Sequence, residues 1–264
     1  MISRRSCCLL FPVLLCSPAF SSSRAEPPVE KEKFHLYLLI GQSNMAGRGI
    51  VVPEENGAPE RVLKFTKENT WAPAVEPLHF DKTIAGVGLG RSFGEFMAKA
   101  EPGVTIGLIP CAVGGTPLDR WLSGGDLYQA ALTRAKLAAK DGVIKGILWH
   151  QGENDAGKKE TADSYLTRLT AAVASWRKDL DSPDLPFVAG KLGEFLATDY
   201  QGKPSYWKQI NAQLDALPRT VAHAAVVDSS GLTAKSDQVH FDTPALREFG
   251  RRYAEKMSLL LKAK

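Results

Sequence analysis

The sequence has 264 residues and a net charge of +4, with 33 Lys and Arg against 29 Asp and Glu. Three arginines lie within positions 1–25, so the rest of the chain is close to neutral, with 30 basic (33 less 3) and 29 acidic side chains. It contains no block of five or six like charges, which argues against nucleic acid and against an anionic membrane as partners. Three of the four cysteines are in the same N-terminal segment. Cys111 therefore has no partner for an internal disulfide, and a hydrophobic core must stabilise the remaining chain.

The N-terminal segment, positions 1–25, has the pattern of a secretory signal peptide. Two arginines precede a ten-residue apolar run, Cys7–Cys16, which is too short to span a bilayer. Ser23-Arg24-Ala25 then offers a cleavage site of the small-x-small type. We expect residues 1–25 to be removed, and residues 26–264 to form one domain that is secreted or periplasmic and has no membrane anchor.

Apolar runs predict six β-strands in chain order. Several runs are hydrophobic throughout, without the alternation of a half-exposed strand, as expected for strands buried on both faces. The predicted strands are Leu36–Ile40, Val62–Phe65, Val104–Ile109, Ile144–Trp149, Phe187–Ala189 and Ala224–Val227. The stretch Pro53–Thr83 is rich in proline and charge, and we interpret it as an insertion or long loop near the mouth of the sheet.

Helical spacing of apolar residues is clearest in two later segments. One set is Tyr165, Leu166, Leu169, Val173 and Trp176, and the other is Leu246, Phe249, Tyr253, Met257 and Leu260. Thr243 is the predicted N-cap of the last helix, with Pro244 as its first residue. Strands that alternate with helices predict a parallel sheet in a three-layer α/β/α sandwich.

Three polar loops that contain glycine follow predicted strands directly. They are GQSNMAG (41–47) after the first strand, CAVGGTPLDRW (111–121) after the third and HQGENDAG (150–157) after the fourth. Ligands bind at the carboxyl ends of the strands in open parallel sheets. We therefore expect the three loops to share one edge of the sheet and to form a site there.

Ser43, in the first loop, is a candidate nucleophile, and a serine hydroxyl needs a histidine to take its proton. His240 has an acid at useful spacing, because Asp237 lies three residues before it and can reach the imidazole Nδ1 on a turn. Taken alone, a serine after a strand more often caps backbone amides. Met45 also stands where the Gly-x-Ser-x-Gly motif has its second glycine. These residues alone leave both interpretations open.

An acyl-transfer site also needs hydrogen-bond donors for an oxyanion. The Gly114-Gly115 pair can present a backbone N–H without steric cost, or it can simply form a tight turn. Gln151 and Asn154, in the third loop, are candidate amide donors, or they make only loop hydrogen bonds.

Four blocks of the sequence together resemble the SGNH hydrolase superfamily. They are GQSNMAGRG, PCAVGGTPLDRW, WHQGEND and the late DQVHF, and they are most similar to the sialate O-acetylesterase and acetylxylan esterase branch, the sixth carbohydrate-esterase family. The segment from Ala74 to Met97 also resembles that branch, and the likeness extends from about Phe34 to Leu260. The resemblance implies the SGNH hydrolase fold with a flavodoxin-like parallel sheet.

The resemblance also implies site roles. Ser43 would be the nucleophile, His240 the general base and Asp237 its orienting acid, with neither metal nor cofactor. The backbone N–H groups of Ser43 and Gly115 would form the oxyanion hole, completed by Asn154 or by Gln151. Side chains in or beside the same loops are expected to contact substrate, namely Gln42, Trp121, Glu153 and Arg48.

The implied function is that of a secreted serine esterase that removes O-acetyl groups from sugars. The single-domain length and the EPLHFD and GVG sequences favour acetylated xylan or a related polysaccharide over O-acetylated sialic acid. Sialic acid carries a carboxylate, for which Arg48 and Arg120 are candidate partners, although both arginines could instead orient loops through salt bridges.

Two other function classes compete with this interpretation. His150, Glu153 and Asp155 could join Asp237 and His240 in a metal site, although no helical His-x-x-x-His is present. A non-catalytic carbohydrate-binding protein could stack sugar rings on Trp71, Trp121 or Trp149, since an indole face suits a pyranose. Cys111 ends an apolar strand and is assigned no catalytic role.

Overall fold

The computed structural model of the chain describes residues 24–197 and 205–263. The predicted signal peptide lies outside the described residues except for its last two positions, and its removal stays a prediction. Within the described ranges, none of the helices has both the length and the apolarity needed to cross a membrane.

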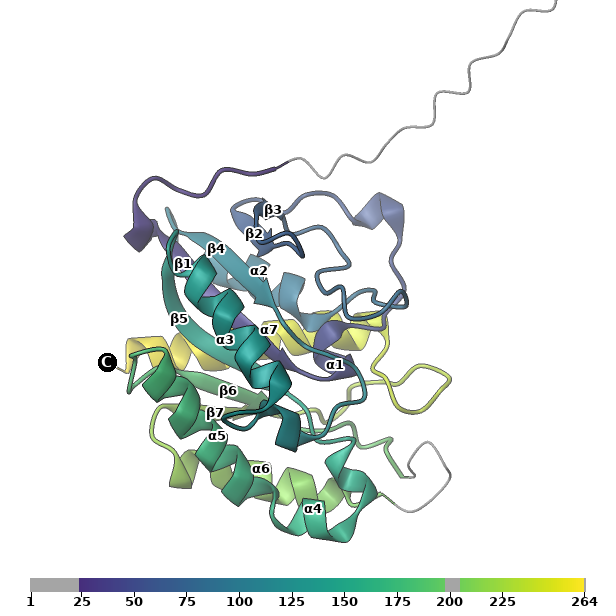
Figure 1. Ribbon diagram of the computed structural model, residues 1–264. Coiled ribbons are helices and arrows are strands. Elements are labelled where there is room, and N and C mark those ends of the chain that lie inside the picture. The colour runs from purple at the N-terminus through teal and green to yellow at the C-terminus, as the bar shows by residue number, and fades with distance from the viewer. Residues whose placement is uncertain (1–23, 198–204, 264) are drawn as a thin grey trace, which may run out of the picture.

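A seven-stranded sheet forms the centre of the molecule, in the order β3-β2-β4-β1-β5-β6-β7 (Figure 1). The strands are β1 (Phe34–Gly41), β2 (Val62–Phe65), β3 (Trp71–Pro73), β4 (Thr105–Pro110), β5 (Val143–His150), β6 (Phe187–Gly190) and β7 (Ala224–Val227). All neighbours pair in parallel except β2 and β3. The five strands β4-β1-β5-β6-β7 have the flavodoxin-like order, in which the chain changes direction across the sheet at β1. The six predicted strands and the predicted sandwich are confirmed.

The stretch Pro53–Thr83 was expected to be an insertion or long loop, and it is partly sheet. β3 pairs antiparallel with β2 at the edge, through a turn closed by the Thr66 N–H donating to the Thr70 carbonyl at 2.8 Å. A three-residue strand is too short to show a period in sequence. Pro73 also counts against a strand, although an edge strand tolerates proline.

Helices cover both faces of the sheet. α2 (Leu89–Ala100) and α7 (Thr243–Lys262) lie on one face, and α3 (Asp126–Ala138), α5 (Tyr165–Asp179) and α6 (Trp207–Thr220) on the other. The short helices are α1 (Ser43–Ala46), α4 (Lys159–Asp163), and the 3-10 turns η1 (Lys31–Lys33), η2 (Pro53–Glu55), η3 (Leu118–Trp121) and η4 (Asp155–Gly157). The predicted N-cap of α7 is wrong by one residue: the Asp242 carboxylate accepts the Ala245 N–H and caps the helix.

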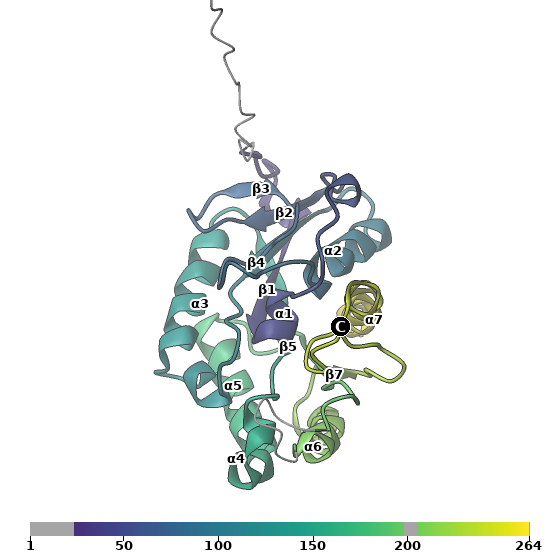
Figure 2. The ribbon, with the colours of Figure 1, turned by 90° about the vertical axis from the view of Figure 1, so that its right-hand side faces the viewer.

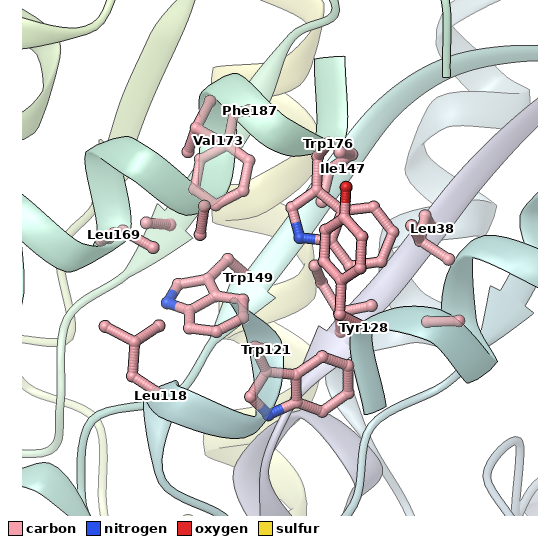
Figure 3. Close-up of a cluster of buried hydrophobic side chains, with 14 of the residues drawn as sticks. Leu38, Leu118, Trp121, Tyr128, Ile147, Trp149, Leu169, Val173, Trp176 and Phe187 are labelled. Atoms are coloured by element: carbon pink, nitrogen blue, oxygen red, sulfur yellow. The ribbon is translucent and has the colours of Figure 1, made fainter. Parts of the chain in front are cut away.

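The core lies on both sides of β1. Leu36 and Leu38 face the cluster beneath α3 and α5, whereas Tyr37 and Leu39 face the cluster beneath α2 and α7. Figure 3 shows three tryptophans in the first cluster, where Trp121 and Trp149 meet edge to face, with ring centroids 6.0 Å apart. The helical periods of α5 and α7 are confirmed: the apolar residues named for them are buried, except Leu166 and Leu260, which are half-buried against the core.

The carboxyl ends of the parallel strands meet at one edge of the sheet. Figure 2 views the molecule from that edge, with α1 near the centre, α3 and α5 on one side and α2 and α7 on the other. The loops that follow β1, β4 and β5 gather there because neighbouring parallel strands end side by side. The chain before α7, residues 228–242, comes to the same edge.

Candidate active site

The turn after β1 places Ser43 at this edge. Gly41 ends the strand with φ +133°, and a Cβ there would lie 2.0 Å from the carbonyl oxygen of His150. Only glycine fits this approach. The Gln42 N–H then donates to the same carbonyl at 2.9 Å, and Ser43 is the first residue of α1. The turn therefore fastens the serine to the end of β5, the neighbouring strand.

His240 and Asp237 meet Ser43 from a loop near the other end of the chain. The Nε2 atom of His240 lies 3.0 Å from Ser43 Oγ, and its Nδ1 atom lies 2.8 Å from Asp237 Oδ2. The other carboxylate oxygen of Asp237 accepts the backbone N–H groups of Val239 and His240, each at 2.9 Å. These bonds fold residues 237–240 into a tight turn, in which Gln238 has φ +54°.

The electrostatics of this turn favour a charged Asp237. Partial burial by itself raises the pKa of the carboxyl group, but the hydrogen bonds from His240 and from the two backbone N–H groups outweigh it, and the pKa of Asp237 is lowered. The carboxylate can only accept, so Nδ1 of His240 carries a proton. Nε2, on the other side of the ring, faces the Ser43 hydroxyl and can accept its proton.

The loop after β4 lies on the other side of Ser43. A Cβ on Gly114 would be 3.4 Å from the Ser43 Cβ, whereas a Cβ on Gly115, which has φ +79°, would meet open space. The Gly114 N–H donates to Asp81 Oδ2 at 2.9 Å. Among the described residues, the N–H groups of Gly115 and Ser43 have no acceptor. The backbone thus has two unused donors in this region, one on Ser43 itself and one on the residue after Gly114.

The two amide side chains of the loop after β5 differ in what they can offer. Gln151 is fully buried, and its Nε2 donates to the Thr116 carbonyl at 3.0 Å and to Asp155 Oδ2 at 2.6 Å. Both of its N–H groups are thus in use within the fold. Asn154 is exposed, and its Nδ2 donates one hydrogen bond to the Gly115 carbonyl, at 3.1 Å. Asn154 retains one N–H and lies against the glycine loop.

Three of the four side chains expected to contact substrate are buried instead. Trp121 is 0% exposed and belongs to the core, with its Nε1 donating to Thr116 Oγ1. Arg48 is buried with Asp81, and their Nη2 and Oδ2 atoms are 2.7 Å apart. The buried carboxylate of Glu153 accepts a hydrogen bond from Asn44 at 2.6 Å. Each of these side chains holds the loops in place. The expectation of substrate contact is wrong for Trp121, which is inaccessible, and stays a prediction for Arg48 and Glu153.

Gln42, the fourth side chain, uses its amide oxygen within the fold but not its amide N–H groups. Its Oε1 accepts the Asn154 N–H at 3.3 Å, which ties the loops after β1 and β5 together. Its Nε2 has no acceptor among the described residues, although the residue is only 1% exposed. The amide is therefore oriented but keeps donors to offer.

The three tryptophans proposed to stack on sugar rings do not lie on the surface of the described residues. Trp71 and Trp149 are both nearly inaccessible, as Trp121 is. The Nε1 of Trp71 donates to Asp141, and that of Trp149 to Tyr165. All three indoles pack inside, so none of them can stack on a sugar ring.

The side chains considered for a metal site take part in separate hydrogen-bond networks. Asp155 accepts hydrogen bonds from Arg168, Gln151 and the Leu118 N–H. Across residues 24–197 and 205–263, no group of three or more His, Cys, Asp or Glu side chains is arranged to hold a metal ion.

Burial raises the pKa of Cys111 to about 11, which keeps its thiol protonated.

Two residues that the sequence analysis did not single out for the site lie close to Ser43. Asp81 binds the Gly114 N–H and Arg48, and Asn44 contacts the backbone on both sides of His240. Burial by itself raises the pKa of Asp81, but the Arg48 and Gly114 hydrogen bonds outweigh it, and the pKa is lowered. Adjacency to Ser43 was the available sequence signal for Asn44. Asp81 lies in the EPLHFD sequence that resembles the family, but its partners could not be foreseen, because each is distant from it in the sequence, one on either side.

Comparisons with known proteins identify the family of the chain. Residues 33–259 match the family model described as carbohydrate esterase, sialic acid-specific acetylesterase. The chain is 32% identical over 240 residues to a protein of Arabidopsis thaliana named as a probable carbohydrate esterase, covering 83% of this chain and 88% of that protein. The crystal structure of the Arabidopsis protein is similar with a TM-score of 0.77, 29% identity and coverage of 85% and 98%.

Two more distant structures share the fold. NanS is similar with a TM-score of 0.73 and 17% identity, covering 90% of this chain and 100% of NanS. A carbohydrate acetylesterase from Xanthomonas citri is similar with a TM-score of 0.67 and 22% identity, covering 87% of this chain and 56% of that one. The resemblance drawn from the four sequence blocks is confirmed. The chain belongs to the sialic acid-specific acetylesterase family of carbohydrate esterases, and it is a carboxylic ester hydrolase.

Proposed function

We propose that this esterase removes O-acetyl groups from sugars through Ser43, His240 and Asp237, with Ser43 as the nucleophile. One observation carries the proposal: an unbroken row of hydrogen bonds joins the three side chains at the carboxyl edge of the sheet, 3.0 Å from Ser43 Oγ to His240 Nε2 and 2.8 Å from His240 Nδ1 to Asp237 Oδ2. Both distances are within the reach that proton transfer requires.

The reaction would proceed through an acetyl-enzyme. As Ser43 Oγ attacks the acetyl carbonyl carbon, its proton passes to Nε2 of His240, and the carbonyl oxygen becomes an oxyanion. When the tetrahedral intermediate collapses, Nε2 returns the proton to the departing sugar oxygen and the acetyl group stays on Ser43. Water then gives its proton to Nε2 and attacks the acetyl-enzyme, which releases acetate and restores the serine. Asp237 stabilises the imidazolium throughout and stays ionised.

Three donors are proposed for the oxyanion. The unused N–H groups of Ser43 and Gly115 support two of these roles. Asn154 is the better supported of the two amide candidates, because both N–H groups of Gln151 are occupied within the buried fold. Gln42 is proposed to donate its unused amide hydrogens to the bound sugar.

A neutral acetylated polysaccharide, such as acetylated xylan, is the proposed substrate. A sialic acid carboxylate needs a cationic partner. Arg48 is buried in its pair with Asp81, and Arg120 pairs with Asp126, with its Nε 2.9 Å from Oδ1. Both arginines proposed as carboxylate partners are engaged elsewhere, which supports the neutral substrate. The second candidate, O-acetylated sialic acid, is favoured by the description of the family itself.

Acetate release distinguishes the two substrates. We expect the wild-type protein to release acetate faster from acetylated xylan than from 9-O-acetyl sialic acid, and Ser43→Ala to release none from either. Faster release from the sialic acid would contradict the xylan assignment only, whereas release by Ser43→Ala would contradict the mechanism.

The cellular location of the protein is proposed from the N-terminal segment, residues 1–25. We expect the protein to be exported and its mature form to begin at Glu26. N-terminal sequencing of protein collected outside the cytoplasm checks both points, and a mature chain that starts at Met1 would contradict them.

A further inference from the structure

We infer that Asn44 is a positioning residue that aligns the His240 loop with Ser43, an inference that rests on the proposed catalytic role of those two residues. Asn44 directly follows Ser43 and is 1% exposed. Its Oδ1 accepts the Phe241 N–H at 3.1 Å, and its Nδ2 donates to the Val239 carbonyl, also at 3.1 Å. One side-chain amide thus binds the backbone on both sides of the histidine.

The need for this contact follows from the location of Asp237. Asp237 orients the imidazole, but it lies in the same tight turn as His240, so the two side chains would move together if the turn shifted. Asn44 connects that turn to the residue next to the nucleophile. Lys235 makes a second connection, because its N–H donates to the His240 carbonyl at 2.8 Å and its Nζ donates to the Arg48 carbonyl at 2.7 Å. That connection ends five residues after Ser43, whereas the Asn44 bonds begin at the residue next to the nucleophile and flank the histidine.

Glu153 determines the orientation of the Asn44 amide. Nδ2 also donates to Glu153 Oε1, at 2.6 Å. Burial by itself raises the pKa of Glu153, but the nearby His150 ring and the Asn44 hydrogen bond outweigh it, and the pKa is lowered, so the carboxylate is charged. A flipped amide would direct Oδ1 at two acceptors, the carboxylate and the Val239 carbonyl. Only the observed orientation satisfies all three partners.

Glu153 is itself anchored to the core. Its Oε1 lies 3.4 Å from Nε2 of His150, the last residue of β5. Nδ1 of His150 is 3.3 Å from the hydroxyl of Tyr253 on α7, which donates to the Trp149 carbonyl at 2.7 Å. Asn44 is thus the point at which the ends of β1 and β5 and the loop before α7 are tied together.

The experiment compares Asn44→Ala with Asn211→Ala as a matched control. Asn211, on α6, also makes two backbone bonds through its amide: it accepts the Leu192 N–H at 2.8 Å and donates to the Leu192 carbonyl at 3.0 Å. Leu192 lies in a loop without proposed catalytic residues. We expect Asn44→Ala to lower kcat on 4-nitrophenyl acetate by roughly 10- to 100-fold, part of the 100- to 10,000-fold that a positioned base contributes. KM should stay within about twofold, because the misplaced base acts in the transition state. Labelling of Ser43 by a fluorophosphonate should slow in parallel, and Asn211→Ala should keep its kcat.

A second pair of variants tests the orientation and does not depend on how well the alanine variant folds. Asn44→Asp puts a carboxylate against Glu153 and should lower kcat more than Asn44→Ala. Adding Glu153→Gln to Asn44→Asp supplies an N–H for the new carboxylate. The double variant should have a kcat at least tenfold higher than that of Asn44→Asp, a difference of about 1.4 kcal/mol.

The outcomes separate this inference from the proposed mechanism. A folded Asn44→Ala with wild-type kcat, or a double variant no better than Asn44→Asp, would overturn the positioning role while Ser43→Ala remains inactive. Equal losses of kcat in Asn44→Ala and Asn211→Ala would overturn it too, because general loosening would then explain both. Activity in Ser43→Ala would instead remove the nucleophile on which the inference rests.

Discussion

The two sides of Ser43 are held by buried carboxylates in different ways. On the oxyanion side, Asp81 binds the Gly114 N–H directly and forms an ion pair with Arg48, in which the two side chains are 1% and 3% exposed. On the base side, Glu153 acts through the neutral amide of Asn44. Removing one member of a buried ion pair leaves an uncompensated charge, whereas removing an amide leaves unpaired polar groups. Substitutions on the Asp81 side should therefore mainly lower the free energy of unfolding. Substitutions on the Glu153 side should mainly disturb the alignment of His240 with Ser43.

Packing differs between the two sides as well. Phe241, next to His240, packs edge to face on His150, Phe195 and Phe249. Gly115, on the opposite side, has open space where a side chain would be. Space for an acyl group is thus on the glycine side, while the base is backed by aromatic rings.

The largest expected effect is that of His240→Ala, which removes the proposed base. We expect kcat on 4-nitrophenyl acetate to fall by roughly 10,000-fold or more, with the unfolding free energy changed little, because the ring lies at the rim of the site. Steady-state kinetics and urea unfolding of the same preparation measure the two quantities. A variant that keeps a tenth of the wild-type kcat would show that His240 does not accept the proton of Ser43.

Arg48→Met tests the charge on the oxyanion side. It leaves the buried Asp81 without its partner and should lower the free energy of unfolding by about 3–5 kcal/mol. Arg120→Met is the control, since its pair with Asp126 is exposed and its loss should hardly change stability. Urea unfolding measures both variants, and equal losses would show that burial does not distinguish the two pairs.

Asn154→Ala removes the one proposed oxyanion donor that is a side chain. We expect kcat to fall by roughly 100- to 1000-fold while the fold is kept, as for the loss of one such donor elsewhere. Gln151→Ala should act mainly on stability, because the amide of Gln151 is occupied by Thr116 and Asp155. Kinetics together with thermal unfolding separate the two. The reverse pattern would assign the donor to Gln151.

The smallest predicted effect is a pH dependence on the oxyanion side. Burial lowers the pKa of His79 to about 4, against the opposing charge of Asp81. Between pH 6.5 and about 4 the unfolded chain binds a proton at this residue and the folded one does not. Its contribution to stability is therefore complete above pH 6.5 and is lost as the pH falls, by up to about 1.4 kcal/mol per pH unit.

Unfolding by urea at pH 7 and pH 5 measures this dependence. His79→Gln should flatten the pH dependence of the wild-type protein in that range, while Glu153→Gln should not. The lowered pKa of Glu153 affects stability only below its ordinary value near 4.5. An unchanged dependence in His79→Gln would assign the titration to another group.

The sequence by itself determined what depends on near neighbours along the chain. Continuous apolar runs identified six of the seven strands, because a strand buried on both faces has no exposed position to alternate. The close spacing of Asp237 and His240 indicated their contact, which a single tight turn makes locally. The position of Ser43 at a strand end, with the order of strands and helices, indicated the edge of the sheet where it would meet them. Its catalytic role stays a proposal.

Only the tertiary structure decided which polar side chains face the site and which hold it. Arg48 and Trp121 carry the chemistry of sugar-binding residues, and both are buried by partners from other segments. Asn154 is the better supported donor candidate only because Thr116 and Asp155 occupy the Gln151 amide. Asn44 reaches Glu153, and the backbone beside His240, from a distant part of the sequence. Burial and hydrogen bonding between distant segments are not encoded in local spacing, and they require the folded chain.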